Sequence, residues 1–310
     1  MLQNNPTTGS VIANIDNIKQ INYAAIYKVI EKHTPISRVK IANLSKLAPA
    51  SVTKITRQLL ESGLIKETER QASTGGRSAI SLAPNGEAIH VLAITIGRDL
   101  LSISRYDLFG NALTTKDVNI ESTNGDALML QISHEIHLQL NQNKEFTTKI
   151  SAIAFTLSGL VNTKEGTIIY SSRYSFDQFP LVNNIEKTFN IPTFIGNHTR
   201  ALSLAEHYFG ASRDCLDSIL LSVHHGVGSG ILIQGKCLIG ENCNIGEIGH
   251  IQVNPAGKQC HCGNFGCLET EINDNIIFEK VQMALERGSL SSLELDTLSI
   301  EKIYQAYCRS

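Results

Sequence analysis

The charged side chains divide this chain into a basic front and an acidic remainder, and that division constrains the fold most. Residues 1 to 86 hold 11 Lys and Arg against 5 Asp and Glu, a net charge of +6, whereas the rest holds 16 against 24, a net charge of −8. Such a split is typical of a polyanion-binding module joined to an acidic body. The 310 residues also exceed one average core, so we expect more than one domain.

Composition excludes several protein classes. With 42% hydrophobic and 18% charged residues the chain resembles an ordinary globular protein, which excludes long-range disorder and fibrous folds. No apolar run reaches the roughly 18 residues of a membrane span, and the N-terminus lacks the basic flank and apolar stretch of a signal peptide. We therefore expect a cytoplasmic protein that does not enter a membrane.

Residues 1–83 have the pattern of a winged helix-turn-helix DNA-binding domain. Apolar residues recur at helical spacing over residues 15–30, and Ser37 is a suitable N-cap for a short second helix. Pro49 suits the first turn of a third helix, which would end before Gly63. Two short strand-like segments then flank the sequence QASTGGR, which predicts a hairpin wing.

The third helix has an apolar face built on Val52, Ile55 and Leu59 and a polar, basic face for the DNA major groove. The predicted DNA-binding residues on the polar face are Ser51, Thr53, Lys54, Thr56 and Arg57. Arg77, near the tip of the wing, is predicted to enter the minor groove. The alternatives are a solvated helix face and a surface loop with an incidental arginine.

The acidic remainder has the alternating pattern of an α/β body. Strand-like segments at 90–96, 100–108 and 111–120 predict consecutive antiparallel pairing, and a helical pattern follows at 127–140. A buried strand at 149–157 and further strand–helix alternation complete the α/β pattern. The glycine-rich segment 224–230 (HHGVGSG) could turn backbone N–H groups towards a phosphate or sugar oxygen, or it could be a plain hairpin turn.

One His and three Cys residues form the strongest local motif. His250, Cys260, Cys262 and Cys267 make a Cys₃His set suited to tetrahedral Zn²⁺ with every position filled, which is a structural rather than a catalytic site. His261 ranks below His250 as a ligand because it lies between two ligating cysteines. The alternative is free cysteines beside an unrelated histidine.

Two carboxylates flank this metal motif. A metal held through His250 would fix Glu247 before it and Glu269 after the last cysteine, and fixed carboxylates suit sugar hydroxyls. Each glutamate taken singly could equally be a solvated surface charge.

The segments GEIGH, CHCGNFGCLE, HHGVGSG and TLSGLVN together resemble the ROK family, which contains sugar repressors and sugar kinases built on an actin-like ATPase fold. The winged helix-turn-helix resembles that of the repressor branch. The resemblance implies a first actin-like lobe over residues 84–198 and a second lobe with the zinc motif over residues 199–310. Family members continue through further strands and helices, so the second lobe is expected to be incomplete.

The resemblance also implies a ligand. Matched onto this chain, the sugar-binding positions are Gly159, Asn197, His198, Glu247, His250 and Glu269. The implied ligand is an amino-sugar phosphate, N-acetylglucosamine 6-phosphate, which releases the protein from operator DNA, and the implied assembly is a dimer or tetramer.

Two departures separate the chain from the family's kinases. Kinases carry an Asp-x-Gly-Gly-Thr phosphate loop where this sequence reads Ile-Thr-Ile-Gly-Arg-Asp, so use of ATP is not expected. His198 occupies the position of the kinases' catalytic aspartate, and a neutral imidazole lacks the negative acceptor of a carboxylate. The sequence therefore predicts a repressor that is not an enzyme. The alternatives are a ROK sugar kinase and a truncated regulator that no longer responds to its inducer.

Overall fold

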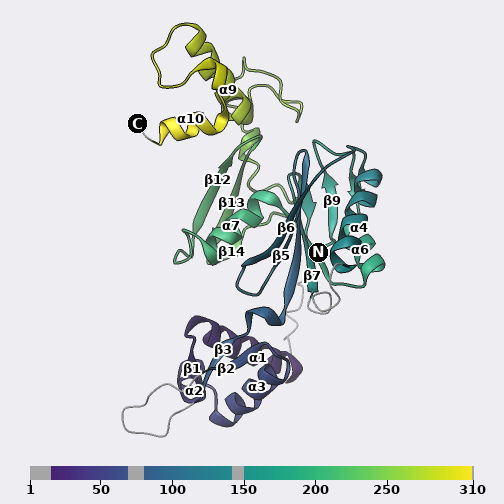
Figure 1. The fold of residues 1–310 in the computed structure, drawn as a ribbon, viewed down its shortest axis with the longest axis vertical. Coiled ribbons are helices and arrows are strands. Elements are labelled where there is room, and N and C mark those ends of the chain that lie inside the picture. Colours follow the sequence, from purple (N-terminus) through teal and green to yellow (C-terminus); the bar gives the residue numbers. More distant parts are fainter. Residues whose placement is uncertain (1–14, 69–79, 142–149, 309–310) are drawn as a thin grey trace, which may run out of the picture. The chain divides into compact units, whose positions relative to one another are not determined.

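The computed structural model describes residues 15–68, 80–141 and 150–308. The chain divides into two compact units (Figure 1). The first comprises Met1–His90 with Asp107–Asn111, and the second comprises Val91–Tyr106 with Ala112–Ser310. The first unit extends beyond residue 83 because the Leu108 N–H donates to the carbonyl of Gly86, at the start of the short 3₁₀ helix η1 (Gly86–Ala88).

The described residues of the first unit form three α-helices and a small antiparallel sheet. The helices are α1 (Ile15–Lys32), α2 (Arg38–Ser45) and α3 (Pro49–Glu61). The strands are β1 (Ile36–Ser37), β2 (Ile65–Thr68) and β3 (Ser81–Pro84), in the order β1-β3-β2. The predicted N-cap is confirmed, since the Ser37 hydroxyl accepts a hydrogen bond from the Lys40 N–H at 3.4 Å.

The core of this unit joins all three helices to the sheet. Ile26 and Ile30 of α1, Val52 and Leu59 of α3, and Leu82 of β3 are fully buried against one another. The apolar face predicted for the third helix is therefore the face that holds the unit together.

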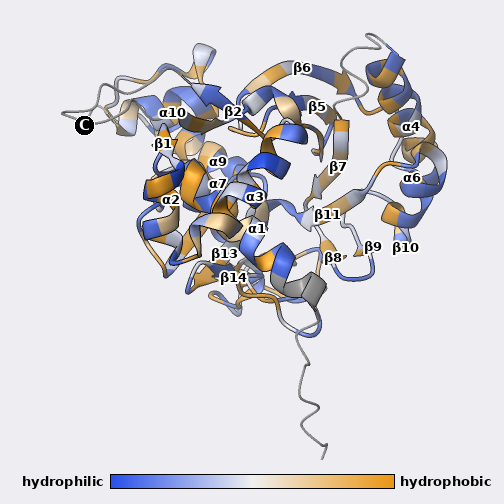
Figure 2. Ribbon diagram, turned by 90° about the horizontal axis from the view of Figure 1, so that it is seen from below, coloured by the Kyte–Doolittle hydropathy of each residue, from blue (hydrophilic) through white to orange (hydrophobic). Residues whose placement is uncertain are grey.

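The second unit begins with a five-stranded mixed sheet of order β11-β7-β4-β5-β6. Its strands are β4 (His90–Ile96), β5 (Leu100–Tyr106), β6 (Ala112–Asn119), β7 (Ile150–Leu157) and β11 (Thr193–Asn197). The predicted antiparallel pairing of the first three strands is confirmed, and β7 pairs in parallel with β11. Figure 2 shows hydrophobic residues along β7 and β11.

Helices α4 (Gly125–Asn141) and α6 (Leu181–Phe189) lie side by side against this sheet (Figure 1). Ile132 of α4, Ile185 of α6 and Phe155 of β7 are almost completely buried in one core. Sequence patterns did not predict α6, nor the small sheet of β8 (Leu160–Asn162), β9 (Thr167–Tyr170) and β10 (Asp177–Phe179). These strands have only three or four residues each, too few to show a period.

After β11, the second unit continues with a helix packed on a three-stranded sheet. The helix is α7 (His198–Phe209), and the antiparallel strands are β12 (Ser218–Val223), β13 (Val227–Ile233) and β14 (Lys236–Cys237). The close packing requires Gly230, because a Cβ there would lie 2.4 Å from the Ser203 hydroxyl of α7. Strand β13 starts at Val227, so only residues 224–226 of the glycine-rich segment form a turn.

The remaining helices lie on either side of the segment 260–267, which carries the three clustered cysteines. They are the 3₁₀ helices η2 (Ile248–His250) and η3 (Leu295–Thr297), and the α-helices α8 (Glu269–Ile272), α9 (Asp274–Glu286) and α10 (Ile300–Tyr307). Across the described ranges, every helix is too short or too polar to cross a membrane.

A pair of substitutions on α1 tests the core of the first unit. Ile30→Ala removes a side chain that is 0% exposed and should lower the free energy of unfolding by about 2–5 kcal/mol. Ile21→Ala on the same helix, where the side chain is 65% exposed, should change it by less than about 0.5 kcal/mol. Urea denaturation followed by circular dichroism measures both, and equal effects would show that α1 is packed differently.

Candidate functional site

Four of the five side chains predicted to contact DNA from the third helix are exposed on α3. Ser51, Thr53, Lys54 and Arg57 share the face opposite Val52 and Leu59. Hydroxyls and basic groups on one exposed helix face can donate to phosphates and base edges. The predicted face is therefore present, although its contact with DNA stays a prediction.

The outward placement predicted for Thr56 is wrong. Thr56 is 0% exposed, and its hydroxyl donates to the Val52 carbonyl at 2.8 Å. It also accepts a hydrogen bond from the Arg38 Nε at 3.1 Å. The helical period explains the error, because Thr56 lies four residues after Val52 and three before Leu59 and therefore shares their buried face. Thr56 joins α3 to α2.

Arg77 lies within residues 69–79, outside the part of the chain that the structure describes. Its predicted contact with the minor groove stays a prediction. The strands on either side are in place, since β2 pairs antiparallel with β3 from Ile65 opposite Pro84 to Thr68 opposite Ser81.

The four predicted metal ligands come together in the second unit. One ligand atom each from His250, Cys260, Cys262 and Cys267 lies within 4.8 Å of all the others. His250 Nδ1 is 3.5 Å from Cys260 Sγ, and Cys262 Sγ is 3.7 Å from Cys267 Sγ. Two sulfurs of a tetrahedral site with Zn–S bonds of about 2.3 Å would be about 3.8 Å apart. The donor set and its spacing therefore fit a four-coordinate metal.

The chain is turned tightly around this cluster. Gly263 and Gly266 adopt φ of +92° and +62°, the left-handed conformation that favours glycine. The Cys260 N–H donates to the Asn264 carbonyl at 2.8 Å, and the Gly266 N–H donates to the Lys258 carbonyl at 2.8 Å. These bonds close the loop that carries three of the four ligands.

Glu269 lies next to the cluster at the start of α8. Its Oε1 accepts from the Cys260 thiol at 2.9 Å and lies 2.9 Å from His261 Nδ1 and 3.7 Å from His250 Nδ1. The residue is only 8% exposed, so it is not a solvated surface charge. His261 therefore lies against Glu269, and the four-ligand cluster uses His250 instead.

Glu247 is held through a buried arginine that sequence patterns did not single out. Arg200 of α7 is 5% exposed and donates from Nη2 to the carbonyls of Cys243 and Ile245, the latter at 3.0 Å. These carbonyls precede Gly246 and Glu247, so Arg200 positions the loop that carries the glutamate. Burial raises the pKa of Glu247, and the charges of Arg200 and His250 oppose that rise.

Asn197 connects the Gly159 turn to α7. Its amide Nδ2 donates to the Gly159 carbonyl at 3.0 Å, and its Oδ1 accepts from the Arg200 N–H at 3.2 Å as the N-cap of α7. Gly159 needs its glycine, because its φ is +150° and a Cβ would meet the Tyr170 carbonyl. Both the Nδ2 and the Oδ1 atoms of the buried Asn197 amide are thus hydrogen-bonded to backbone groups. The sugar contact predicted for Asn197 stays a prediction.

His198 is the first residue of α7 and is half-buried. Burial lowers the pKa of His198 below its usual value, and the nearby imidazole of His224 lowers it further. A neutral imidazole donates one hydrogen bond and accepts another, so His198 can still contact a sugar oxygen.

Tyr174 and Arg173 contact the turn between β4 and β5. The sequence predicted that this turn lacks a phosphate loop. The Tyr174 hydroxyl lies 2.6 Å from the Gly97 carbonyl and 2.8 Å from the Arg98 carbonyl. Arg173 pairs with Asp99 at 2.7 Å. The carbonyls of this turn and the Asp99 carboxylate are therefore bonded to Tyr174 and Arg173 of the second unit.

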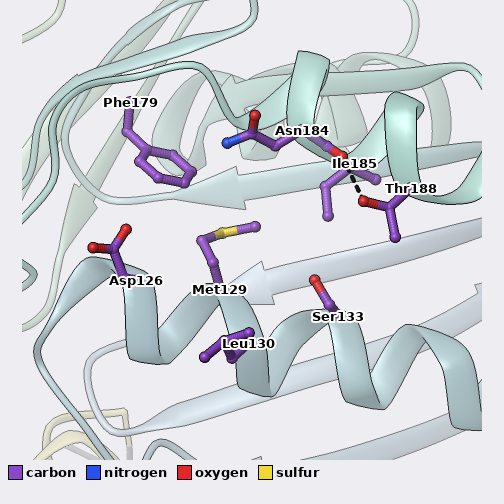
Figure 3. Close-up of a pocket in the computed structure, with 8 residues that line it drawn as sticks. All are labelled: Asp126, Met129, Leu130, Ser133, Phe179, Asn184, Ile185 and Thr188. Carbon is purple, nitrogen blue, oxygen red and sulfur yellow. Dashed lines mark hydrogen bonds between the residues drawn. The ribbon is translucent and has the colours of Figure 1, made fainter.

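A pocket of about 310 Å³ opens between α4 and α6 (Figure 3). Met129, Leu130 and Phe179 make its apolar wall, and Asp126 lies at one side. None of the predicted site residues lines this pocket, so it is separate from the Cys-rich segment and its two glutamates.

The fold and the motifs define the class of this protein. A model of the ROK family matches residues 91–309. The chain therefore belongs to the ROK family.

Individual relatives extend the match through the front unit. The DNA-binding transcriptional dual regulator NagC of Escherichia coli K12 is 44% identical over 295 residues, 95% of this chain and 73% of that protein. The DNA-binding transcriptional repressor Mlc of the same organism is 34% identical over 96% of this chain and 73% of that protein. A crystal structure of a ROK family transcriptional regulator, a homolog of the Mlc protein, superposes with a TM-score of 0.81 at 39% identity, over 94% of this chain and 74% of that one.

The lowered pKa of His198 predicts a pH dependence of stability. Because the folded state disfavours the charged form of this histidine, its contribution to stability is present above the usual histidine pKa and is lost as the pH falls towards the lowered folded pKa. Between about pH 7.5 and about pH 5.5, the thermal midpoint should fall less in His198→Asn than in the wild type. His134→Asn on α4, an exposed histidine, is the matched control. Equal falls in wild type and His198→Asn would contradict the prediction.

Proposed function

We propose that this protein is a sugar-responsive transcriptional repressor. Its front unit is a winged helix-turn-helix that binds double-stranded operator DNA, and its body binds an amino-sugar phosphate that releases the DNA. The observation that carries the proposal is the length of the match to DNA-binding regulators. The NagC match spans 95% of the chain, and so includes the basic front that precedes the ROK family match at residue 91.

The front unit supplies the DNA contacts. Ser51, Thr53, Lys54 and Arg57 on α3 enter the major groove, and Arg77 reaches the minor groove from the wing. Thr56 does not take part, because its hydroxyl is used inside the unit. A two-fold operator suits a dimer or tetramer, and we propose such an assembly.

The body supplies the effector site. Glu247 and Glu269 accept hydrogen bonds from sugar hydroxyls. The other sugar-binding residues are His198, His250, Asn197 and Gly159, whose carbonyl Asn197 holds. Some relatives are named N-acetylglucosamine repressor, which favours N-acetylglucosamine 6-phosphate as the effector. The effector must bind the DNA-free conformation more tightly, since a ligand with equal affinity for both states shifts nothing.

Zn²⁺ is the metal that suits the Cys₃His cluster, and its role is structural. With His250, Cys260, Cys262 and Cys267 as ligands every tetrahedral position is filled by protein, which leaves no place for a reacting water. Zinc would order the loop between η2 and α8, and with it Glu269 and His261.

The kinase alternative is less supported. The relatives NagC and Mlc are named as DNA-binding regulators, the β4–β5 turn lacks the kinases' phosphate loop, and His198 stands where a kinase needs a carboxylate base. Turnover of ATP by the purified chain in the presence of an amino sugar would overturn this reading.

Operator binding with and without effector tests the proposal. A fragment selected by the protein from random double-stranded DNA should bind with an affinity that falls steeply with salt, and N-acetylglucosamine 6-phosphate should release it. Arg57→Ala should weaken binding about tenfold or more, since a good base contact contributes about 1–3 kcal/mol. Arg213→Ala, an exposed arginine of the second unit, is the matched control. DNA binding that no sugar phosphate alters would favour a regulator without an inducer.

Metal removal tests the zinc proposal. Purified protein should contain about one zinc ion, and a strong chelator should lower the thermal midpoint by at least about 5 °C, because the metal stabilises only the folded loop. Cys262→Ala should lose the zinc, whereas Cys215→Ala, an exposed cysteine outside the cluster, should keep it. Metal-free protein with an unchanged midpoint would rule the site out.

A further inference from the structure

His224 begins the turn between β12 and β13, beside the proposed sugar site. Its N–H donates to the Gly226 carbonyl at 3.0 Å. A Cβ on Gly226 would lie 3.7 Å from Glu269 Oε2, so the turn lies against one of the proposed sugar carboxylates. The His224 side chain is 71% exposed and is therefore open to a ligand.

A buried carboxylate orients this histidine. Asp274, the first residue of α9, is 8% exposed, and its N–H donates to the His224 carbonyl at 2.9 Å. Its Oδ2 lies 3.6 Å from His224 Nδ1. One residue therefore holds both the backbone and the ring of His224. The carboxylate lies on the Nδ1 side of the ring, at ion-pair rather than hydrogen-bond distance, and the exposed ring leaves Nε2 for another partner.

A tyrosine of α10 holds the carboxylate in turn. The Tyr304 hydroxyl donates to Asp274 Oδ1 at 2.7 Å, and this bond raises the pKa of Tyr304 to about 12. The Tyr304–Asp274–His224 chain thus connects α10 and α9 to the turn. A mostly buried carboxylate with a tyrosine hydroxyl and an imidazole against it is more than a solvated charge.

His198 of α7 approaches the same imidazole. Burial lowers the pKa of His198 and the charge of His224 lowers it further, as expected for two imidazoles close enough for their protonated forms to repel each other. An anion bound between them would remove that repulsion. A carboxylate at position 198 would repel a phosphate dianion, whereas an imidazole can donate to it.

We propose that His224, positioned by Asp274 and Tyr304, binds the phosphate group of the effector together with His198. The inference rests on the proposed function, since it takes the effector to be a sugar phosphate, and it adds the residues that distinguish the phosphorylated from the free sugar. Imidazole N–H groups and the backbone N–H groups of a tight turn are suitable donors to a phosphate. The glutamates contact the sugar hydroxyls, and the histidine pair contacts the phosphate.

Calorimetry on the full chain tests this assignment with N-acetylglucosamine 6-phosphate and free N-acetylglucosamine as the two probes. The wild type should bind the phosphorylated sugar more tightly. His224→Ala should weaken binding of the phosphorylated sugar about tenfold or more, as expected for a hydrogen bond to a charged group, and should change binding of the free sugar about twofold or less. Asp274→Asn and Tyr304→Phe should reduce the same preference to a smaller extent. His134→Ala on α4 is the matched control and should leave both affinities unchanged.

The ratio of the two affinities separates a phosphate contact from a general role in stability. Equal losses for both sugars in His224→Ala, or no loss for either, would overturn the assignment. Tyr304→Phe keeps the test decisive if Asp274→Asn unfolds, and circular dichroism checks each variant. A wild type that binds neither sugar would overturn the proposed function itself, whereas one that prefers the free sugar would overturn the phosphate site.

Discussion

The buried guanidinium of Arg200 is the interaction on which the arrangement of the second unit depends. A charged side chain with 5% exposure needs acceptors, and the carbonyls of Cys243 and Ile245 accept from its Nη2, whereas its Nη1 is buried without a hydrogen-bond partner among the described residues. The Arg200 N–H is at the same time capped by Asn197, whose amide also holds the Gly159 turn. One residue of α7 therefore connects β11, the Gly159 turn and the loop that carries Glu247. Loss of its acceptors would leave an uncompensated buried charge, so these parts are expected to keep their arrangement together.

Glu269 connects the proposed effector site to the Cys₃His cluster. It follows the last cysteine by two residues and contacts Cys260 and His250, two of the four predicted metal ligands, as well as His261. The proposed sugar carboxylate is therefore in direct contact with the metal motif. A metal in the cluster would order the effector site without touching the effector, which accounts for a structural ion in a protein whose proposed work is binding.

Much of the fold could be predicted from local patterns. The long elements α1, α3, α4 and β4 to β7 show clear periods, and Pro49, Ser37 and Gly63 mark ends that the structure reproduces. The strands β8 to β10 are too short to show a period, and they form because the core around Phe155 covers them. Helix α6 does carry Leu181, Ile185 and Phe189 at helical spacing, a signal that could have predicted it. The error at Thr56 has another cause. Its hydroxyl suggested an exposed position, but a hydroxyl can be buried where it donates to the preceding turn of its own helix and accepts from Arg38.

The sequence by itself determined the two-part charge pattern, the helix ends and the four clustered ligands His250, Cys260, Cys262 and Cys267, because these depend on residue type and short spacing. Only the tertiary structure decided which polar groups meet across long separations. Arg200 reaches carbonyls 43 and 45 residues away, and Tyr304 reaches Asp274 across 30 residues. Sequence spacing does not predict such pairs. Each pair forms because packing removes two polar groups from water, and a buried polar group needs a hydrogen-bond partner. For that reason the metal motif could be predicted from the chain, whereas the orientation of His224 could not.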